Sequence, residues 1–407
     1  MINIAIMGYG TVGAGVFKVL KMNSEAITRR VGHRLNIKYV LDLRDFPGDP
    51  AEDVLTHDFN DILNDDSVSI VVETMGGLKP AYNFTKELLL AGKNVCTSNK
   101  ELVAEHGVEL RSIAHDMNCN YLFEASCGGG IPIIRVLNSS LTAEEIEEVT
   151  GILNGTTNYI LTSMTQEGAD FNDALKEAQK KGFAELHPEA DIEGMDACRK
   201  IAILSSLAYG KHVNYNYVPT EGITNVDATD IRYAKELGVV IKLLATSRRE
   251  KEGTWAMVAP MMIGSENPLS AVDGVMNAVM VKGNAVGTTM FYGSGAGSLP
   301  TASAVCGDVI DAAKHLHTTI KTDSGTGVTM RLMKIDNVAR PFFVRFSGTE
   351  DEARAAFGDI HDVIRLDGVS GEFGFLTPTM KEGDFKAAAE KSGKVIKWYR
   401  RGKKEEQ

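Results

Sequence analysis

The 407-residue sequence lacks several features that would place it in a class at once. It has no apolar run of about 18 residues or more, which a membrane-spanning helix needs, and its start reads as a strand rather than a signal peptide. Its only basic block is the terminal WYRRGKK, and its net charge is −11. These absences argue against a membrane or a nucleic acid as the main partner, and we expect a soluble, cytoplasmic protein.

Cysteine is scarce and has no recognisable pattern. The five cysteines form no CxxC pair, and neither they nor the nine histidines have the spacing of a metal site. This usage is typical of reduced thiols in the cytosol.

Short buried strands alternate with helices in the first third of the chain. The expected strands are 2–10, 35–43, 67–75, 93–99 and 119–126, and the expected helices are 11–27, 81–92 and 107–118. This alternation predicts an α/β fold with a parallel, doubly wound sheet of the Rossmann type. We assign it to a dinucleotide-binding domain of residues 1–130.

The pattern changes after about residue 130. Strand-like stretches at 145–155, 256–264 and 274–293 flank helices at 157–166 and 196–210, which predicts an α+β domain over 131–300. A helix at 301–316 is expected to return to the first domain, and the polar, glycine-rich 322–328 reads as a linker. Residues 329–407 then have the order βαββαβ of a small ferredoxin-like domain.

A glycine-rich turn, Gly8-Tyr9-Gly10-Thr11-Val12-Gly13, joins the first strand to the first helix. Gly8 permits the tight turn, Gly10 lets a pyrophosphate approach the backbone, and Gly13 allows helix and strand to pack closely. The helix start supplies free N–H groups for the phosphates. The turn therefore predicts dinucleotide binding, and a turn used only for packing is the alternative.

The end of the second strand, VLDLRD, should select the coenzyme. Asp42 would accept a hydrogen bond from the ribose 2′-OH of NAD, whereas Arg44 would pair with the 2′-phosphate of NADP. Both readings stay open, as does a third in which both residues are solvated loop charges.

Two lysines stand where a reaction could use them. Lys100 follows Asn99 and the fourth strand, at the edge where doubly wound sheets bind ligands; a helix cap followed by a surface lysine is the alternative. Asp196 and Lys200 lie one helical turn apart at the start of an apolar helix. They form either an ordinary surface ion pair or a half-buried proton donor held by a carboxylate.

Two further glycine-containing turns carry polar groups. Glu124 precedes Gly128–Gly130, a turn whose oxygens could hold a monovalent cation or which simply forms a hinge between domains. Gly155 and Thr156 open a helix that offers hydroxyls and N–H groups, with helix capping alone as the alternative.

Together these motifs resemble homoserine dehydrogenase. The matching stretches are GYGTVGAG, TSNKELVA, EASCGGGIPII, GILNGTTNYILTSM, GFAELHPEADIEGMDACRKIAIL and YGSGAGSLPTASAV, in the order of that family and from residue 4 to about 316. The resemblance implies the reversible NAD(P)H-dependent reduction of L-aspartate 4-semialdehyde to L-homoserine, in threonine and methionine biosynthesis, by a homodimer or higher oligomer.

The resemblance also implies the site residues. Lys200 donates the proton to the aldehyde oxygen, Asp196 helps to hold the reacting group, and Lys100 is shared by cofactor and substrate. The implied substrate contacts are Glu185, Asp191, Gly155 and Thr156. The assigned cofactor contacts are Gly8, Gly10, Thr11, Val12, Gly13, Arg44, Thr74, Lys100 and Gly295. The implied sodium site is Glu124, Cys127, Gly129 and Ile131, mostly through backbone oxygens.

The sequence departs from the family pattern in places. His187 replaces a usual acidic residue, Phe183 replaces a tyrosine of some members, and Cys127 is unusual in the ion loop. The C-terminal unit resembles an ACT domain, but its loop FSGTEDEA lacks the usual effector-binding pattern, so assembly is its expected role. Another NAD(P)-dependent aldehyde or amino-acid dehydrogenase, or a non-catalytic nicotinamide sensor, is the alternative function.

Overall fold

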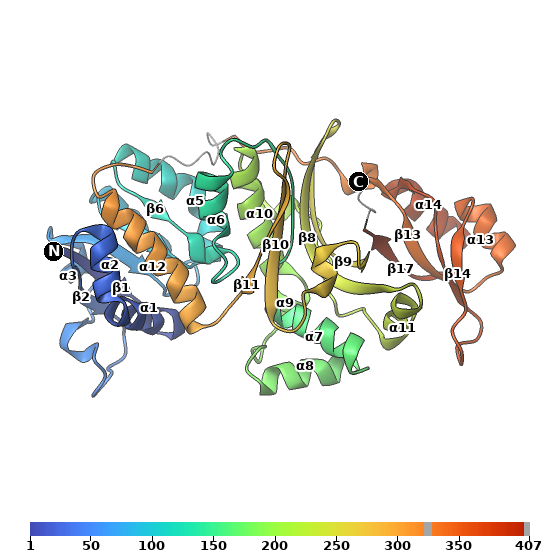
Figure 1. The fold of residues 1–407 in the computed structure, drawn as a ribbon, viewed down its shortest axis with the longest axis horizontal. Helices are drawn as coiled ribbons and strands as arrows, with labels where there is room; N and C mark the ends of the chain where they lie inside the picture. The colour runs from blue at the N-terminus through green and yellow to red at the C-terminus, as the bar shows by residue number, and fades with distance from the viewer. Residues whose placement is uncertain (321–327, 403–407) are drawn as a thin grey trace. The chain divides into compact units, whose positions relative to one another are not determined.

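The computed structural model describes residues 1–320 and 328–402 (Figure 1). The chain divides into two compact units. Unit 1 comprises Met1–Ile146, Ala202–Tyr215 and Gly283–Met330. Unit 2 comprises Glu147–Ile201, Asn216–Lys282 and Arg331–Gln407. No helix of the described residues is long and apolar enough to cross a membrane.

Unit 1 is built on a parallel sheet whose strand order is β3-β2-β1-β4-β5-β6. The strands are β1 (Ile2–Met7), β2 (Leu35–Leu41), β3 (Leu55–Thr56), β4 (Val68–Glu73), β5 (Asn94–Thr97) and β6 (Tyr121–Leu122). Central apolar side chains such as Ile4, Ile6 and Val72 are fully buried, as expected for strands covered on both faces. The predicted doubly wound fold is confirmed, and its chain reversal falls between β1 and β4.

Helices cover this sheet. They are α1 (Thr11–Met22), α2 (Ser24–Val31), α3 (Asn60–Leu63), α4 (Ala81–Leu90), α5 (Lys100–Asp116), α6 (Ile133–Arg135) and α12 (Ser298–Lys314). Helix α12 packs against α1 (Figure 1), and a Cβ at Gly15 would lie 2.7 Å from the Ser298 hydroxyl oxygen. This close approach places Val305 and Val309 in the same apolar core as Val16.

Three predicted elements of unit 1 are corrected. The helix expected over 107–118 is α5, which begins at Lys100 and ends at Asp116. The helix expected over 11–27 divides at Asn23 into α1 and α2. The strand expected over 119–126 keeps only the two residues of β6, and a 3-10 turn, Glu124–Ser126, follows it. The strand ends there because the backbone N–H of Glu124 donates to the buried carboxylate of Asp308, 2.8 Å away, instead of to a neighbouring strand.

Unit 2 contains the mixed sheet in which β10, β7, β8 and β9 are neighbours in that order. The strands are β7 (Ile146–Ile152), β8 (Val239–Glu250), β9 (Gly253–Gly264) and β10 (Met276–Gly283), and β10 is followed along the chain by β11 (Gly287–Ser294). The helices are α7 (Gly155–Gln166), α8 (Phe171–Lys180), α9 (Glu189–Ile192), α11 (Ala228–Glu236) and the first part of α10 (Met195–Tyr209), whose residues from 202 onward belong to unit 1.

The long strand β8 was not predicted from the sequence. Lys242 interrupts its apolar run and obscures the pattern. In the structure this lysine is buried, and its ammonium donates to the Val272 carbonyl (2.6 Å) and to the Asp273 carboxylate (2.9 Å). A buried lysine satisfied by distant partners cannot be recognised from local sequence.

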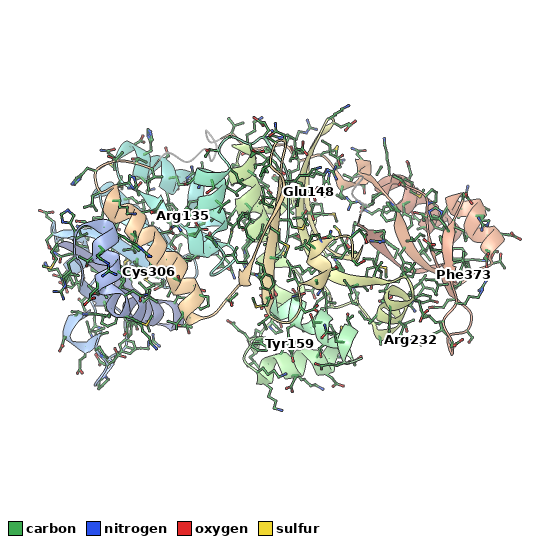
Figure 2. The ribbon with its side chains drawn as sticks, viewed as in Figure 1. Arg135, Glu148, Tyr159, Arg232, Cys306 and Phe373 are labelled. Carbon is green, nitrogen blue, oxygen red and sulfur yellow. The ribbon has the colours of Figure 1, made fainter. Side chains whose placement is uncertain are left out.

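The C-terminal part has the predicted βαββαβ order. Its elements are β13 (Phe342–Phe346), α13 (Glu350–Phe357), β14 (His361–Ile364), β15 (Phe373–Leu376), α14 (Glu382–Ser392) and β17 (Val395–Arg401), with β12 (Ala339–Arg340) and β16 (Met380–Lys381) as a short separate pair. The strands lie in the order β17-β13-β15-β14 around a core of phenylalanines, of which Figure 2 labels Phe373.

This part is continuous with the rest of unit 2, because β17 pairs in parallel with β9 through Arg400 and Met261. The structure therefore groups it with 147–201 and 216–282, and the division into three domains at 1–130, 131–300 and 329–407 stays a prediction. Of the predicted linker 322–328, residues 322–327 lie outside the described residues.

The five cysteines all lie within the described residues, where each is buried and none forms a disulfide; Figure 2 labels one of them, Cys306. Burial raises the pKa of Cys306 to about 12 and that of Cys119 to about 11. We therefore expect native protein to resist a disulfide-exchange reagent at about pH 8, because reaction needs the thiolate. In denatured protein, all five cysteine thiols should react with the reagent. Fast labelling of the native protein would contradict this burial.

Candidate active site

The glycine-rich turn of unit 1 has the geometry that a bound pyrophosphate needs. Gly8 has a φ of +89°, and a Cβ there would lie 2.9 Å from the Thr74 carbonyl oxygen. A Cβ at Gly13 would lie 1.9 Å from the Gly8 carbonyl oxygen, so helix α1 packs closely on the strands. Nothing lies within 4 Å of the same position at Gly10, which leaves the backbone open to a phosphate.

Neighbouring groups hold this turn in place. The Thr74 hydroxyl donates to the carbonyl oxygens of Gly8 (2.8 Å) and Met7 (3.1 Å). Gly10 is the N-cap of α1 and has no side chain to cap the helix, so the first turn, which contains Thr11 and Val12, presents backbone N–H groups. Gly8, Gly10, Thr11, Val12 and Thr74 are among the residues that the sequence assigned to the cofactor.

The residue after β2 lies directly against the glycine-rich turn. The carboxylate of Asp42 accepts the backbone N–H of Tyr9 at 2.7 Å. It also accepts the Nε and Nη2 groups of Arg44 at 2.9 and 3.0 Å. The hydrogen bonds from Arg44, together with that from Tyr9, lower the pKa of Asp42 to about 2, so this carboxylate is ionised at any physiological pH. The structure thus keeps both candidate ribose-binding residues together rather than excluding one.

Lys100 is the first residue of α5, immediately after the turn that follows β5. Asn99 caps this helix by accepting the backbone N–H of Leu102 at 3.1 Å, and its amide donates to the Gly77 carbonyl at 2.6 Å. The helix cap of the alternative interpretation is therefore present. It fixes the backbone of Lys100 at the carboxyl edge of the sheet.

Glu73 is not among the predicted site residues, and its carboxylate connects the turns after β4 and β5. Its carboxylate is fully buried and accepts the Thr97 hydroxyl at 2.5 Å and the Met75 N–H at 2.8 Å. Burial raises its pKa, and these hydrogen bonds oppose that rise. A glutamate at the end of an apolar strand could have indicated this cluster, because a buried glutamate almost always has hydrogen-bond partners.

In unit 2, Lys200 and Asp196 form a buried ion pair on α10. The ammonium of Lys200 donates to Asp196 Oδ2 at 2.8 Å and to the Leu153 carbonyl at 2.7 Å. The two side chains are only 10% and 3% exposed, which excludes the alternative of a surface pair. A pair this deeply buried is costly to build, so a role beyond stability is indicated.

Asn154 connects this pair to the next group of carboxylates. Its amide nitrogen donates to Asp196 Oδ2 at 2.9 Å and to Asp191 Oδ1 at 2.8 Å, while its amide oxygen caps α7 through the Thr157 N–H at 2.9 Å. Thr156 adds a hydroxyl that donates to Asp191 Oδ2 at 3.2 Å. The sequence prediction missed Asn154, although an asparagine before Gly-Thr-Thr is a recognisable helix cap.

Glu185 is not part of this hydrogen-bonded group. It lies on the exposed loop between α8 and α9, and within the described residues its carboxylate makes no hydrogen bond or ion pair. Its backbone carbonyl accepts the amide of Gln179 at 3.0 Å, which anchors the loop and leaves the carboxylate toward solvent. Asp191, Asp196, Lys200 and Thr156 are thus brought together by the fold, and Glu185 is not.

The predicted sodium loop is built around Glu124, but not in a way that frees its carboxylate. The two carboxylate oxygens accept the backbone N–H groups of Ile134 (2.8 Å) and Arg135 (2.7 Å) at the start of α6. Burial raises the pKa of Glu124, and Arg135, labelled in Figure 2, opposes that rise. No group of three or more His, Cys, Asp or Glu in the described residues could hold a metal. An ion here would have to be held by the main-chain carbonyls of the loop, and sodium stays a prediction.

The same loop approaches Gly295 within unit 1. A Cβ at Gly129 would lie 2.4 Å from the Gly295 carbonyl carbon, and Gly130 donates its N–H to the Ser294 carbonyl at 3.0 Å. Only glycine permits this contact between the two backbones. Two segments that the sequence assigned separately, to ion and to cofactor, therefore lie side by side.

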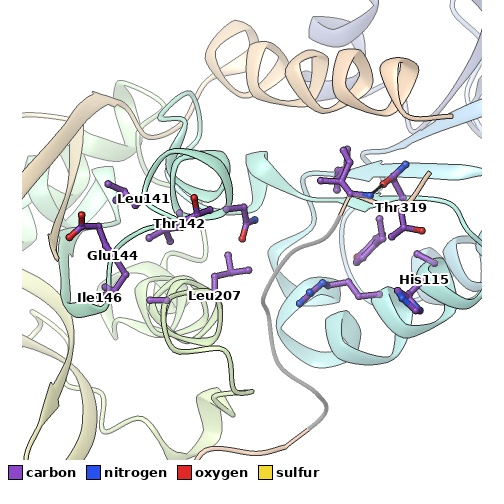
Figure 3. A pocket seen from close by; sticks show the side chains of 16 residues that line it. His115, Leu141, Thr142, Glu144, Ile146, Leu207 and Thr319 are labelled. Atoms are coloured by element: carbon purple, nitrogen blue, oxygen red, sulfur yellow. Dashed lines mark hydrogen bonds between the residues drawn. The ribbon is translucent and has the colours of Figure 1, made fainter. Parts of the chain in front are cut away.

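A cavity of about 550 Å³ in unit 1 contains none of the predicted site residues (Figure 3). Its lining includes His115, Leu141, Glu144, Leu207 and Thr319. Its size alone does not make it the site, because it holds neither the glycine-rich turn nor the buried lysine.

Sequence comparison places the chain among known proteins. Residues 8–124 match the family model of the homoserine dehydrogenase NAD-binding domain, and residues 132–310 match that of homoserine dehydrogenase. The homoserine dehydrogenase of Neisseria gonorrhoeae is 44% identical over 324 residues, which are 77% of this chain and 72% of that protein.

Solved structures agree with the sequence matches. A homoserine dehydrogenase from Thiobacillus denitrificans superimposes with a TM-score of 0.91 at 37% identity, covering 98% of each chain. A hyperthermophilic archaeal homoserine dehydrogenase in complex with NADPH has a TM-score of 0.66 at 30% identity, covering 76% of this chain and 97% of that one.

The fold and the site define an oxidoreductase with a nicotinamide-coenzyme domain. Within that class, the chain belongs to the homoserine dehydrogenase family.

Proposed function

We propose that this chain catalyses the reversible reduction of L-aspartate 4-semialdehyde to L-homoserine with NADPH or NADH. The observation that carries the proposal is the buried Lys200–Asp196 pair, which Asn154 links to Asp191. A bound nicotinamide supplies the hydride that becomes the second hydrogen on the substrate carbon.

The residues of unit 2 supply the proton and hold the substrate. As the aldehyde carbon takes the hydride, its oxygen gains negative charge, and the Lys200 ammonium stabilises that oxygen and transfers a proton to it. Asp196 and the Leu153 carbonyl orient the ammonium, since each accepts one of its hydrogen bonds. In the reverse direction the neutral amine of Lys200 takes the hydroxyl proton of homoserine.

The remaining roles follow from charge and position. The exposed carboxylate of Glu185 would receive the substrate ammonium, and Asp191 with Thr156 would line the same pocket. Lys100 would contact cofactor and substrate from the start of α5. Asp42 and Arg44 together support the use of both coenzymes, because one suits a 2′-OH and the other a 2′-phosphate.

The test compares substrates that differ only in the group Glu185 is proposed to bind. Purified protein should reduce NADP⁺ or NAD⁺ when given L-homoserine. The absorbance of the reduced nicotinamide measures the rate. With 4-hydroxybutyrate, which lacks the amino group, we expect kcat/KM to fall by roughly ten- to a hundredfold, because the charge-assisted contact between Glu185 and the substrate ammonium is lost. Equal turnover of both compounds would remove the amino-acid substrate from the proposal.

Asn154→Ala should lower kcat/KM by roughly ten- to a hundredfold, because it releases both Asp196 and Asp191 from their fixed positions. It should also cost about 1 kcal/mol of stability through the lost helix cap. Asp170→Ala is the matched control, since Asp170 caps α8 but contacts none of the site residues named here. If both variants lose activity equally, the effect is one of stability and the positioning role of Asn154 is wrong.

A further inference from the structure

His57, which is not among the predicted site residues, lies beside Asp42, one of the two candidate ribose-binding residues. Strands β2 and β3 pair in parallel, with Leu41 opposite Thr56, so His57 stands next to Asp42 at the carboxyl edge of the sheet. The ring Nδ1 of His57 lies 2.6 Å from the Asp42 carbonyl oxygen, and its Nε2 lies 3.1 Å from the carboxylate of Asp45. The ring is therefore held on both sides by acceptors.

These two contacts favour the imidazolium form of His57. The nitrogen that faces the Asp42 carbonyl must carry a proton, so in the neutral ring the lone pair of Nε2 faces the Asp45 carboxylate. Protonation turns that unfavourable contact into a charge-assisted hydrogen bond. The hydrogen bond to Asp42 and the charges of Asp45 and Asp42 raise the pKa of His57, with partial desolvation opposing them. Among the described residues, these are the charged groups that face it.

Arg44 is the other cation at this edge. Its side chain is 62% exposed, and its guanidinium rests on Asp42 and lies 5.1 Å from the ring centroid of Phe46. Asp42 itself is only 10% exposed and is fixed to the glycine-rich turn by Tyr9. The fixed carboxylate suits a ribose hydroxyl, whereas a 2′-phosphate needs added positive charge to offset it.

We propose that His57 is a specificity-determining residue of the coenzyme site, and that its protonated form raises the affinity for NADP(H) relative to NAD(H). The proposal rests on the nicotinamide coenzyme of the proposed function. It adds the selection between two coenzymes that share every group except the 2′-phosphate. A cation at this edge should change mainly the affinity for NADP(H), which carries the 2′-phosphate. The ratio of the NADP(H) and NAD(H) affinities therefore isolates the contribution of His57.

The direction of the pH dependence follows from the raised pKa. The preference for NADPH should be greatest below that pKa, where His57 is charged, and should fall as the pH rises through it. Because the site is exposed to solvent, screening keeps the change modest, at about two- to fivefold in the ratio of dissociation constants.

The experiment measures the dissociation constants of NADPH and NADH for the full chain by coenzyme fluorescence, from about pH 6 to about pH 9. The 2′-phosphate itself titrates near about pH 6, and the His57→Gln variant retains that contribution while losing the imidazole. Glutamine also keeps a donor for the Asp42 carbonyl. His33→Gln is the control, since His33 is exposed and precedes β2 at the opposite end of the strand.

We expect the NADPH preference of the wild type and of His33→Gln to fall with pH more steeply than that of His57→Gln. Identical slopes in the wild type and His57→Gln would overturn the proposal. Loss of both coenzymes in His57→Gln would overturn it as well, because His57 would then be structural. Binding of both coenzymes without turnover of homoserine would instead contradict the proposed reaction, and the two failures are therefore distinguishable.

Discussion

Lys200→Ala should reduce kcat by roughly a thousandfold or more. The substitution removes the group that gives the aldehyde oxygen its proton, and general acid catalysis of this kind contributes about 10²–10⁴ in rate. It also removes the positive charge that stabilises that oxygen, so the upper part of the range is expected. Steady-state rates with L-homoserine and either coenzyme measure the effect.

Coenzyme affinity should change little in the same variant, because the substitution leaves the glycine-rich turn and Asp42 intact, and these are the groups proposed to hold the coenzyme. Lys176→Ala is the control for loss of a lysine, since that side chain is 76% exposed on α8. A Lys200→Ala protein that is folded, binds coenzyme and turns over at the wild-type rate would remove Lys200 from the mechanism.

Asp230→Ala should lower the free energy of unfolding by about 3–5 kcal/mol, the cost of removing one partner from a buried ion pair. Asp230 is fully buried on α11, and its carboxylate accepts Arg345 (2.7 Å), Lys397 (2.9 Å) and the hydroxyl of Tyr399 (2.6 Å). The variant leaves two cations and one hydroxyl without this acceptor. Urea unfolding, read as a shift of the midpoint at unchanged slope, measures the loss.

The matched control for this prediction is Asp351→Ala. Asp351 is exposed on α13, and a surface substitution of this kind should change stability by no more than about 0.5 kcal/mol. Equal midpoints for the two variants would show that the cluster around Asp230 does not join α11 to β13 and β17.

The coenzyme turn could be predicted from sequence because its signal is local. Gly8, Gly10 and Gly13 each answer a requirement of one short segment, and the structure shows a tight turn, an open backbone and a close helix contact at these positions. The βαββαβ order of the C-terminal part was predicted for the same reason, because the spacing of apolar residues within each segment indicates a helix or a strand. Strand β8 was missed because Lys242 interrupts its pattern and finds its partners elsewhere in the chain.

The polar connections between segments could not be predicted in this way. Asn154 acts on Asp191 and Asp196, which lie 37 and 42 positions further along the chain, and only the fold brings them together. His57 meets Asp42 because two parallel strands align them, and Glu73 meets Thr97 for the same reason. Residue type indicates that such groups need partners, but it does not say which partners they have.

The most direct test of the central claim is to follow the hydride itself. The protein would be given L-aspartate 4-semialdehyde with NADPH or NADH carrying two deuterium atoms at C4 of the nicotinamide, and the product would be analysed by mass spectrometry. The account predicts L-homoserine with one deuterium on the carbon that bears the new hydroxyl. Homoserine without deuterium, or no homoserine with either coenzyme, would contradict it.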